Sequence, residues 1–385
     1  MILTIVVLLL SLVYVLLMLL YMAGWYLQKR QPAAKDDRAA TMVSIIIPAR
    51  NEAENIVPLL QSVLNNRYPA ALVEIIVVDD NSTDETAALA MGILKNSNGR
   101  VLALKDYLPA HERINSYKKK ALEIAVSESK GQLIITTDAD CIVPENWISS
   151  IVSVYERQDA KFIAAPVVFS QSPIHPVAPV LMLFQSLDFI TMQGITAASA
   201  RLDLGNMCNG ANLAFDKKAF EAVNGYQGID HIASGDDMLL MYKIRQQYPN
   251  GIRYLKSKAA VVQTAAQESW KAFFNQRIRW SSKAGQYQEK KMTGILAMIY
   301  FFNLCFPILV IAGFFNGFFW KLAGIIFLIK IITELLLLIP VAFFFGKQRE
   351  LWAFPLLQPL HILYIISAGF LGKFGSYQWK DRRVK

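Results

Sequence analysis

The sequence predicts an α/β fold, in which a mainly parallel sheet carries helices on both faces and is bracketed by transmembrane helices. Two observations predict it. Between Thr41 and Gln267 short apolar strands alternate with amphipathic helices, and long apolar runs lie on either side of that stretch. Strands that alternate with helices imply a mainly parallel sheet. Ligands of such sheets gather at the carboxyl ends of the strands, near the point where the strand order reverses.

The alternation can be followed along the chain. Asp84 and Glu85 favour a helix N-terminus, and Pro144 stands where another helix would take its first turn. The expected strands are β-branched or aliphatic and end in polar residues; they are Val43–Ile47, Glu74–Asp79, Val101–Leu104 and Leu133–Thr137. The expected helices are Glu54–Asn65, Asp84–Lys95, Lys118–Ser129 and Glu145–Arg157.

The formal charge of +9 does not indicate a nucleic-acid partner. Acidic residues outnumber basic ones between residues 41 and 270, and the positive charge is concentrated beside the apolar runs. That pattern suits anionic lipid headgroups and the control of membrane topology. Cys141, Cys208 and Cys305 fit neither a disulfide framework nor a zinc site, so we expect the folded part to face a reducing cytoplasm. We exclude nucleic acid as a partner.

The N-terminal residues form the first apolar run. Residues 1–27 contain no charged side chain, and the run exceeds the ~20 residues needed to cross a bilayer. A cleaved signal peptide is the alternative, but it would begin with basic residues and end at a small-residue cleavage site. Here the basic residues follow the run, from Lys29 to Arg38. We therefore expect an uncleaved anchor whose C-terminal side faces the cytoplasm.

Three more apolar runs follow the folded part: Thr293–Trp320, Leu322–Phe345 and Leu351–Gly372. The second carries Lys330 and Glu334 one helical turn apart, so the two side chains can pair within the membrane. We favour a structural role for this pair over a path for a charged lipid headgroup.

The third of these runs is the weakest candidate span. It contains Pro355, Gln358, Pro359 and His361, which remove backbone donors or add polar groups. We expect this segment to lie at the membrane interface or to re-enter. Either arrangement would return the basic tail Phe374–Lys385 to the cytoplasm.

Polar stretches follow the first two expected strands. Ser44–Asn55 runs from a strand into a polar loop, a weak signal by itself. Val77–Thr86 places Asp79 and Asp80 at a strand end, where carboxylates can accept hydrogen bonds from an imide N–H and a ribose hydroxyl. The alternative is turn and helix-cap chemistry from residues 80–84. Both interpretations stay open.

The stretch Ile134–Pro144 places Asp138 and Asp140 at the end of a strongly apolar strand. Two carboxylates in a strand-end crevice repel each other unless a cation or a proton intervenes. Mg²⁺ and Mn²⁺ prefer oxygen ligands and are commonly held by one or two carboxylates together with substrate phosphates. The pair fits a divalent metal site, but an Asp-x-Asp is also common by chance, so by itself this motif leaves both interpretations open.

Two further motifs lie near the end of the folded part. In Ala233–Leu240 the adjacent acids Asp236 and Asp237 precede an apolar helical run, which fits either a helix cap or a general base. In Gln276–Trp280, Arg279 can pair with a pyrophosphate and Trp280 can stack on a substrate ring. For Arg277 we expect a side chain that snorkels to lipid headgroups.

Together and in this order, these motifs resemble those of the family 2 glycosyltransferases with the GT-A fold. The resemblance runs from about Thr41 to Gln286 and is greatest to the membrane-embedded branch. That branch contains the cellulose, chitin, hyaluronan and poly-N-acetylglucosamine synthases and many bacterial glycolipid transferases. Asp236 departs from the pattern, because the family usually has Glu at this position.

The resemblance implies roles for individual residues. The metal, Mg²⁺ or Mn²⁺, is held by Asp138 and Asp140, and Asp237 is the catalytic base, with Asp236 beside it. Which of the three lysines from Lys118 to Lys120 contacts the nucleotide is open, with Lys118 the first choice. The donor is bound by Pro48, Arg50, Glu52, Asp79, Asp80, Lys118, Asp138, Gln276, Arg279 and Trp280, and the acceptor by Asn209, Gly210, Ala211, Asn212 and Trp280.

The implied activity is an inverting, metal-dependent transfer of a sugar from a nucleotide-sugar donor, by family habit a UDP-sugar. The acceptor is a hydroxyl of a membrane lipid or a growing glycan at the cytoplasmic face. A processive polysaccharide synthase is the alternative, although the short membrane part argues against an export channel. A non-catalytic scaffold with the same fold is a third hypothesis, which the intact acidic motifs oppose.

The expected organisation follows from these segments. We expect an integral protein of a bacterial inner membrane with its catalytic domain in the cytoplasm. Its parts are an N-terminal anchor (residues 1–27), a basic linker (28–40), the catalytic domain (41–267), a juxtamembrane helix (268–291), a C-terminal membrane region (292–372) and a basic tail (373–385).

Overall fold

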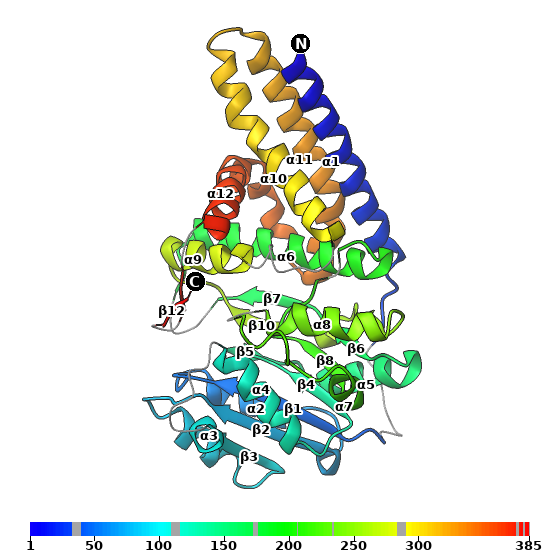
Figure 1. The fold of residues 1–385 in the computed structure, drawn as a ribbon, viewed down its shortest axis with the longest axis vertical. Helices are drawn as coiled ribbons and strands as arrows, with labels where there is room; N and C mark the ends of the chain where they lie inside the picture. Colours follow the sequence, from blue (N-terminus) through cyan, green and yellow to red (C-terminus); the bar gives the residue numbers. More distant parts are fainter. Residues whose placement is uncertain are drawn as a thin grey trace. The chain divides into compact units, whose positions relative to one another are not determined.

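The computed structural model consists of two compact units (Figure 1). The sheet unit comprises Lys29–Ser170 and Met207–Ala265, and the helical unit comprises Met1–Gln28, Gln171–Asn206 and Ala266–Lys385. The structure describes residues 1–32, 40–108, 116–171, 176–205, 207–232, 235–282, 290–374, 377–379 and 382–384.

The main sheet of the sheet unit has the strand order β3-β2-β1-β4-β8-β6-β9. Strands β3, β2, β1 and β4 are parallel, while β8 is antiparallel to both of its neighbours. This arrangement confirms the predicted mainly parallel sheet. The strands are β1 (Val43–Ala49), β2 (Val73–Asp79), β3 (Gly99–Ala103), β4 (Leu133–Thr136), β6 (Phe162–Ala164), β8 (Leu213–Asp216) and β9 (Ile252–Tyr254).

Helices cover this sheet, and they confirm the four that the sequence predicts, with ends shifted by one to two residues. Strands β1, β2 and β4 are almost wholly buried, as expected for parallel strands packed on both faces. The helices of the sheet unit are α2 (Ile56–Leu64), α3 (Thr86–Leu94), α4 (Tyr117–Glu128), α5 (Trp147–Gln158), α7 (Lys217–Ala222) and α8 (Asp236–Gln247), with short 3-10 turns η1 (Ala70–Leu72), η2 (Leu104–Tyr107) and η3 (Lys258–Ala260).

The strand order reverses between β1 and β4. From β1 the chain moves outward to β2 and β3, and then returns to place β4 on the other side of β1. Such a switch point leaves a crevice at the carboxyl ends of the two central strands. A second, three-stranded sheet lies beyond that edge, in which β10 (Val262–Ala265) pairs with β5 (Cys141–Ile142) and β7 (Val167–Ser170).

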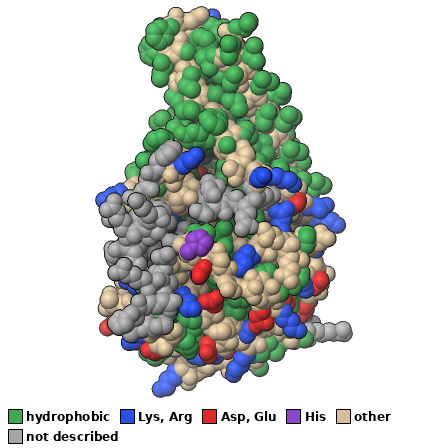
Figure 2. Space-filling view, viewed as in Figure 1, with side chains coloured by type: hydrophobic (Ala, Val, Ile, Leu, Met, Phe, Trp, Pro, Cys, Tyr) green, Lys and Arg blue, Asp and Glu red, His purple; other side chains and the backbone are tan. Residues whose placement is uncertain are grey.

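Among the described residues of the helical unit, five helical segments are long and apolar enough to cross a membrane. Their outward faces carry exposed apolar side chains such as Leu9, Leu12 and Leu328, and Figure 2 shows hydrophobic atoms dominating this surface. The helices of this unit are α1 (Ile2–Leu27), α6 (Pro179–Leu202), α9 (Trp270–Ser281), α10 (Lys290–Gly313), α11 (Phe318–Phe345) and α12 (Phe354–Phe374), with a 3-10 turn η5 (Gln348–Ala353) and a small hairpin of β11 (Tyr377–Trp379) and β12 (Arg382–Val384).

Helix α6 has no counterpart among the predicted elements. It starts at Pro179, a residue favoured in a first helical turn, and runs for 24 residues. It belongs to the helical unit although it lies inside the 41–267 range expected for one domain. Polar residues such as Gln185 and Asp188 interrupt its apolar pattern, and these side chains are buried. The division into an anchor, linker, catalytic domain and tail stays a prediction.

The apolar run Thr293–Trp320 contains the end of one helix and the start of the next. Helix α10 ends at Gly313, and α11 begins only at Phe318. The Trp320 indole folds back and donates to the Val310 carbonyl at 3.0 Å. A Cβ on Gly313 would lie 1.9 Å from this ring, so the turn needs a glycine there. In the sequence this turn is marked by Asn316 and Gly317, a dipeptide typical of turns, between two helices of similar hydropathy.

The predicted pairing of Lys330 with Glu334 is confirmed. The Lys330 ammonium donates to Glu334 at 2.5 Å and to the Gln358 carbonyl oxygen at 2.8 Å. The Gln358 amide donates to Glu334 at 2.6 Å, and the Tyr14 hydroxyl donates to the same carboxylate. This closed network joins α1, α11 and α12, and it favours the structural role. Whether α12 spans the membrane or lies at its interface stays a prediction.

Candidate active site

The loops after β1 and β2 lie side by side and are connected by hydrogen bonds. Ala49 and Asp79 are neighbours at the carboxyl ends of the two strands, and the Asp80 N–H donates to the Ala49 carbonyl at 2.8 Å. The Arg50 guanidinium donates to the Asp80 carbonyl at 2.8 Å and lies 3.7 Å from the Asp80 carboxylate. The structure therefore brings the first two acidic motifs to one edge of the sheet, as predicted.

Side-chain hydrogen bonds hold these two loops in shape. The Thr83 N–H donates to the Asn51 side chain at 2.9 Å, and the Glu52 N–H donates to the Thr86 hydroxyl at 2.8 Å. The Asp84 carboxylate accepts from Thr86 and from the Ala53 N–H. Burial opposes ionisation of Asp84, but the hydrogen bonds from Thr86 and Ala53 outweigh it and lower its pKa. For Asp84 this geometry favours the turn and cap interpretation.

Lys118 connects two acidic motifs that lie about a hundred residues apart in the sequence. Its ammonium lies 2.7 Å from Asp138 Oδ1 at the end of β4 and 3.1 Å from Asp236 Oδ2 at the start of α8. Burial alone would lower the pKa of Lys118, but the charges of Asp138, Asp236 and Asp237 raise it above its usual range. The lysine therefore stays protonated and partly neutralises the acidic edge.

The structure also separates the three lysines of the predicted nucleotide contact. Lys119 is 1% exposed and donates to the carbonyls of Ile229 and Ile232, so it acts inside the fold. Lys120 forms a surface pair with Glu123. Only Lys118 among these three faces the strand-end acids.

Asp237 is held beside this cluster by backbone donors. Its Oδ2 accepts the Gly210 N–H at 3.1 Å, and its Oδ1 accepts the Met238 N–H at 2.7 Å. A Cβ on Gly210 would lie 3.3 Å from the Lys118 nitrogen and 3.5 Å from Asp236 Oδ2. Gly210 therefore lets the backbone of the predicted acceptor loop approach the acidic cluster closely.

Asn212, the last residue of the predicted acceptor loop, is fully buried. Its amide nitrogen donates to the carbonyls of Pro166 and Ala260 at 2.8 Å each, and its oxygen accepts the Trp147 indole N–H at 2.9 Å. These three hydrogen bonds use both N–H donors and the oxygen of the Asn212 amide. We interpret Asn212 as a residue that holds the loop in position, a role that spacing in the sequence does not reveal.

Asp140 lies beside the second sheet. Its carboxylate oxygens lie 3.3 Å from the Thr264 hydroxyl and 3.7 Å from the Cys141 sulfur. Burial, followed by the charges of Asp140 and Asp138, raises the pKa of Cys141, so this thiol stays neutral and is a poor metal ligand. Within the described ranges no group of three or more His, Cys, Asp or Glu side chains could hold a metal. A metal here would need oxygens from a ligand in addition to Asp138 and Asp140.

The Gln276–Trp280 motif lies on α9, in the helical unit. The expectation that Arg277 snorkels to headgroups is wrong, because its side chain is 1% exposed and pairs with Asp188 of α6 at 2.6 Å. A buried carboxylate on another helix attracts the guanidinium inward, and the sequence gives no sign of that partner. Gln276, Arg279 and Trp280 also lie in the helical unit.

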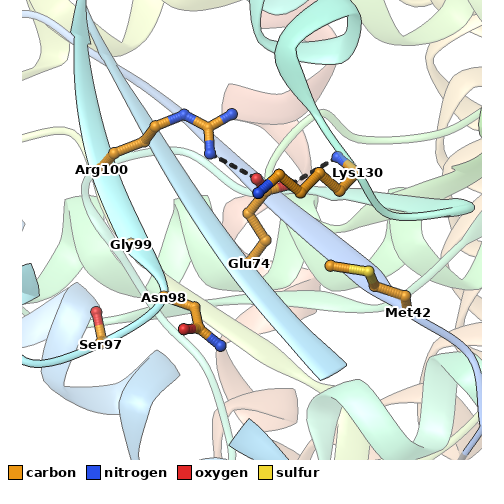
Figure 3. A pocket seen from close by; sticks show the side chains of 7 residues that line it. All are labelled: Met42, Glu74, Ser97, Asn98, Gly99, Arg100 and Lys130. Carbon is orange, nitrogen blue, oxygen red and sulfur yellow. Dashed lines mark hydrogen bonds and ion pairs between the residues drawn. The ribbon is translucent and has the colours of Figure 1, made fainter. Parts of the chain in front are cut away.

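A pocket of about 350 Å³ lies at the opposite, amino end of the strands (Figure 3). Its central acid, Glu74, accepts from Arg100 at 2.6 Å, from the Ser44 hydroxyl at 2.6 Å and from the Lys130 N–H at 2.8 Å. Burial opposes ionisation of Glu74, but these hydrogen bonds outweigh it and lower its pKa. Since the hydrogen-bond partners of Glu74 all come from the protein itself, and the acidic motifs lie at the other end of the strands, this pocket is not the candidate site.

Comparisons with known proteins agree with this architecture. Residues 44–223 match the model of the family described as Glycosyl transferase family 2. The chain is 26% identical over 324 residues to the probable glycosyltransferase YdaM of Bacillus subtilis. The aligned region covers 76% of this chain and 74% of that protein. It is 24% identical over 240 residues to a poly-beta-1,6-N-acetyl-D-glucosamine synthase of Staphylococcus epidermidis, covering 62% of this chain and about half, 53%, of the synthase.

A solved structure has the same fold. The mannosyltransferase PcManGT from Pyrobaculum calidifontis, in complex with GDP-Man and Mn²⁺, superposes with a TM-score of 0.60 at 18% identity, over 96% of this chain and 98% of that one. The predicted GT-A fold is confirmed. Residues 44–223 match a family 2 glycosyltransferase domain, and the chain is a transferase enzyme.

Proposed function

We propose that this enzyme transfers a sugar from a nucleotide-sugar donor to a hydroxyl of a membrane lipid or a growing glycan. The observation that carries the proposal is the convergence around Lys118. This lysine joins Asp138, from the strand-end pair, to Asp236, beside the candidate base. A donor diphosphate and an acceptor hydroxyl must meet in a glycosyltransferase, and here the side chains suited to each lie within one cluster.

Asp237 is the proposed general base. The Gly210 and Met238 N–H groups fix its two oxygens, and the residue lies in the first turn of α8. The carboxylate takes the proton of the acceptor hydroxyl as that oxygen attacks the anomeric carbon. The nucleoside diphosphate leaves from the opposite side, so the configuration at the anomeric carbon is inverted.

Asp138 and Asp140 are the proposed ligands of Mg²⁺ or Mn²⁺. Two carboxylates at a strand end fit a cation that completes its coordination with substrate phosphates. The Mn²⁺ in the PcManGT complex supports the assignment. When bound, the metal offsets the charge that grows on the leaving diphosphate. Lys118 holds a positive charge at the same edge, and it can move from Asp138 to the diphosphate.

The donor and acceptor residues are proposed by the family resemblance. Asp79, Asp80 and the loop that holds Arg50 surround the strand ends where a nucleotide would lie, and the backbone of Gly210 approaches the cluster from the acceptor side. UDP is the proposed nucleotide, although the PcManGT complex contains GDP-Man. The remaining proposed contacts are Pro48, Glu52, Gln276, Arg279, Trp280, Asn209 and Ala211.

Membrane insertion is part of the proposal. The five candidate spans support it, and the basic residues around them support a cytoplasmic active site at a bacterial inner membrane. A lipid acceptor then reaches the enzyme in the plane of the bilayer. Processive synthesis is the second candidate, because the poly-beta-1,6-N-acetyl-D-glucosamine synthase of Staphylococcus epidermidis shares 240 aligned residues.

The test is a donor screen with the full-length protein in nanodiscs, supplied with a membrane lipid extract and Mn²⁺. The donors are UDP-glucose, UDP-N-acetylglucosamine and GDP-mannose, each with a radiolabelled sugar. We expect one UDP-sugar to label the lipid fraction with a single sugar. Long labelled chains would favour the processive synthase. Absence of transfer and of donor hydrolysis with every donor would contradict the proposal.

A further inference from the structure

A buried ion pair joins α9 to α6 inside the helical unit. The Arg277 guanidinium lies 2.6 Å from Asp188 Oδ2, and the two side chains are only 1% and 5% exposed. Removing two charges from water costs free energy that their attraction recovers only in good geometry. Such a pair is therefore weak evidence for stability, and its presence on the helix of the Gln276–Trp280 motif calls for another explanation.

The same guanidinium contacts two residues of that motif directly. Its Nη1 donates to the Gln276 side-chain oxygen at 3.2 Å, and its Cζ lies 4.2 Å from the centre of the Trp280 ring. On the helix turn before, Phe273 lies 4.8 Å from the same carbon. A planar guanidinium can donate in its plane and stack through its faces at once, which a lysine ammonium cannot do. Arg277 therefore restrains both Gln276 and Trp280.

Asp188 is supported in turn from α12. The His361 Nε2 lies 3.6 Å from Asp188 Oδ1, the oxygen that Arg277 does not use. The Tyr364 ring, one turn further along α12, lies 5.4 Å from Phe273 at the base of the cluster. Three helices that are distant in the sequence thus fix the position of one guanidinium.

We propose that Arg277 is a positioning residue: held by Asp188, it sets the side chains of Gln276 and Trp280 for the donor. The inference rests on the proposed function, in which Gln276 and Trp280 bind the nucleotide sugar. It adds a role for Arg277 and Asp188 that the motif itself does not assign. Arg277 acts through its two neighbours and takes no part in the chemistry.

The experiment compares four variants of the full-length protein in nanodiscs. Arg277→Met removes the positive charge. Arg277→Lys keeps the positive charge but replaces the planar guanidinium with an ammonium group. The double variant Arg277→Met/Asp188→Leu removes both buried charges. Lys271→Met is the matched control, because Lys271 lies on the same helix with its side chain exposed.

Three readouts are taken for each variant. The first is the thermal unfolding midpoint. The second is the Trp280 fluorescence, obtained as the difference from the same protein with Trp280→Phe, with and without UDP and Mn²⁺. The third is kcat and KM with the UDP-sugar that the donor screen identifies. The fluorescence readout needs no turnover, so it tests the inference even if the proposed function fails.

We expect Arg277→Lys to unfold near the wild-type midpoint but to change the Trp280 emission and to lower kcat/KM on the order of 10²-fold, the cost of a small misplacement. The double variant should recover the midpoint that Arg277→Met loses, because no unpaired charge remains buried. Its kcat/KM should stay low. Lys271→Met should match the wild type in all three readouts.

Two results would overturn the inference. One is a double variant with wild-type kcat/KM, which would make the ion pair structural only. The other is unchanged Trp280 emission in Arg277→Lys. If wild-type protein transfers no sugar from any donor, the proposed function fails, whereas a Trp280 emission that changes in Arg277→Lys still supports the positioning role.

Discussion

At the scale of single residues, the acidic edge of the sheet unit is organised by a few charged contacts. Lys118 pairs with Asp138 and Asp236, and backbone N–H groups hold Asp237 beside them. Like charges so close together repel unless a cation lies between them. The lysine supplies one positive charge, and the proposed metal would supply more when the diphosphate adds its own negative charge.

Asp237→Asn should abolish transfer while donor binding survives, because the base acts on the acceptor hydroxyl. The amide keeps the size of the side chain but cannot take a proton. We expect kcat to fall by at least ~10²–10⁴-fold, the usual cost of losing a general base. The measurement pairs turnover with UDP binding by isothermal titration. Asp236→Asn serves as the comparison. If Asp236→Asn were inactive and Asp237→Asn active, the general base would be Asp236 and the assignment to Asp237 would be wrong.

Asp140→Asn should remove metal-dependent turnover and leave the fold intact. Wild-type activity should vanish in EDTA and return with excess Mn²⁺ or Mg²⁺, because the diphosphate needs a cation beside the strand-end acids. Binding of Mn²⁺ in the presence of UDP, followed by electron paramagnetic resonance, should weaken in the variant. Full activity of Asp140→Asn in EDTA would refute the metal assignment.

At the scale of elements, the loop before β8 is held by contacts to three other parts of the sheet unit. Asn212 links α5, through Trp147, to the carbonyls of Pro166, before β7, and Ala260, in η3. This fixes the loop that carries Gly210 against the acidic cluster. A single buried amide thereby connects the packing of the sheet to the geometry of the candidate site.

Asn212→Ala should therefore destabilise the sheet unit markedly. The change leaves two carbonyls and an indole N–H buried without their partner, and each such group costs ~1–3 kcal/mol. We expect a loss of about 3 kcal/mol or more in the free energy of unfolding, measured by denaturant titration. Asn98→Ala is the matched control, since Asn98 is exposed and its side-chain amide donates to the Ala70 carbonyl at 3.1 Å. Equal effects in the two variants would contradict the positioning role.

At the scale of the whole molecule, the distribution of apolar and basic segments governs membrane placement. The candidate spans expose many leucine, isoleucine and phenylalanine side chains, while the sheet unit buries most of its own. Helix α12 is less apolar than α1, α10 and α11, and it contains the buried Gln358 and a proline, Pro359, inside the helix. The orientation of the C-terminus therefore depends on how the bilayer accommodates α12.

We predict that the basic tail lies in the cytoplasm. Three full spans after a cytoplasmic domain would strand Lys380, Arg382, Arg383 and Lys385 outside, and short basic flanks resist that placement. A cysteine introduced at Ser376, which lies outside the described residues, should react with a membrane-impermeant thiol reagent only after the cells are lysed. The background variant carries Cys141, Cys208 and Cys305 as serine. Labelling in intact cells would place the tail outside.

The sequence by itself determined the parallel strands, the helices between them and the order of the acidic motifs. These features are local, because residue periodicity and polar residues at strand ends act within a few positions. It also indicated which edge of the sheet carries the ligand, since parallel strands bring their carboxyl ends together. The pairing of Lys330 with Glu334 could be predicted for the same reason, as the two residues lie one helical turn apart.

The tertiary structure alone decided which lysine faces the acids, how Asn212 is used and why Arg277 is buried. Each depends on partners that are distant in sequence: Asp188 and Arg277 are 89 residues apart. It also placed α6 with the membrane-type helices, although neighbouring residues belong to the sheet unit. Spacing along a chain cannot encode such contacts, because the free energy of a charge or amide depends on what surrounds it after folding.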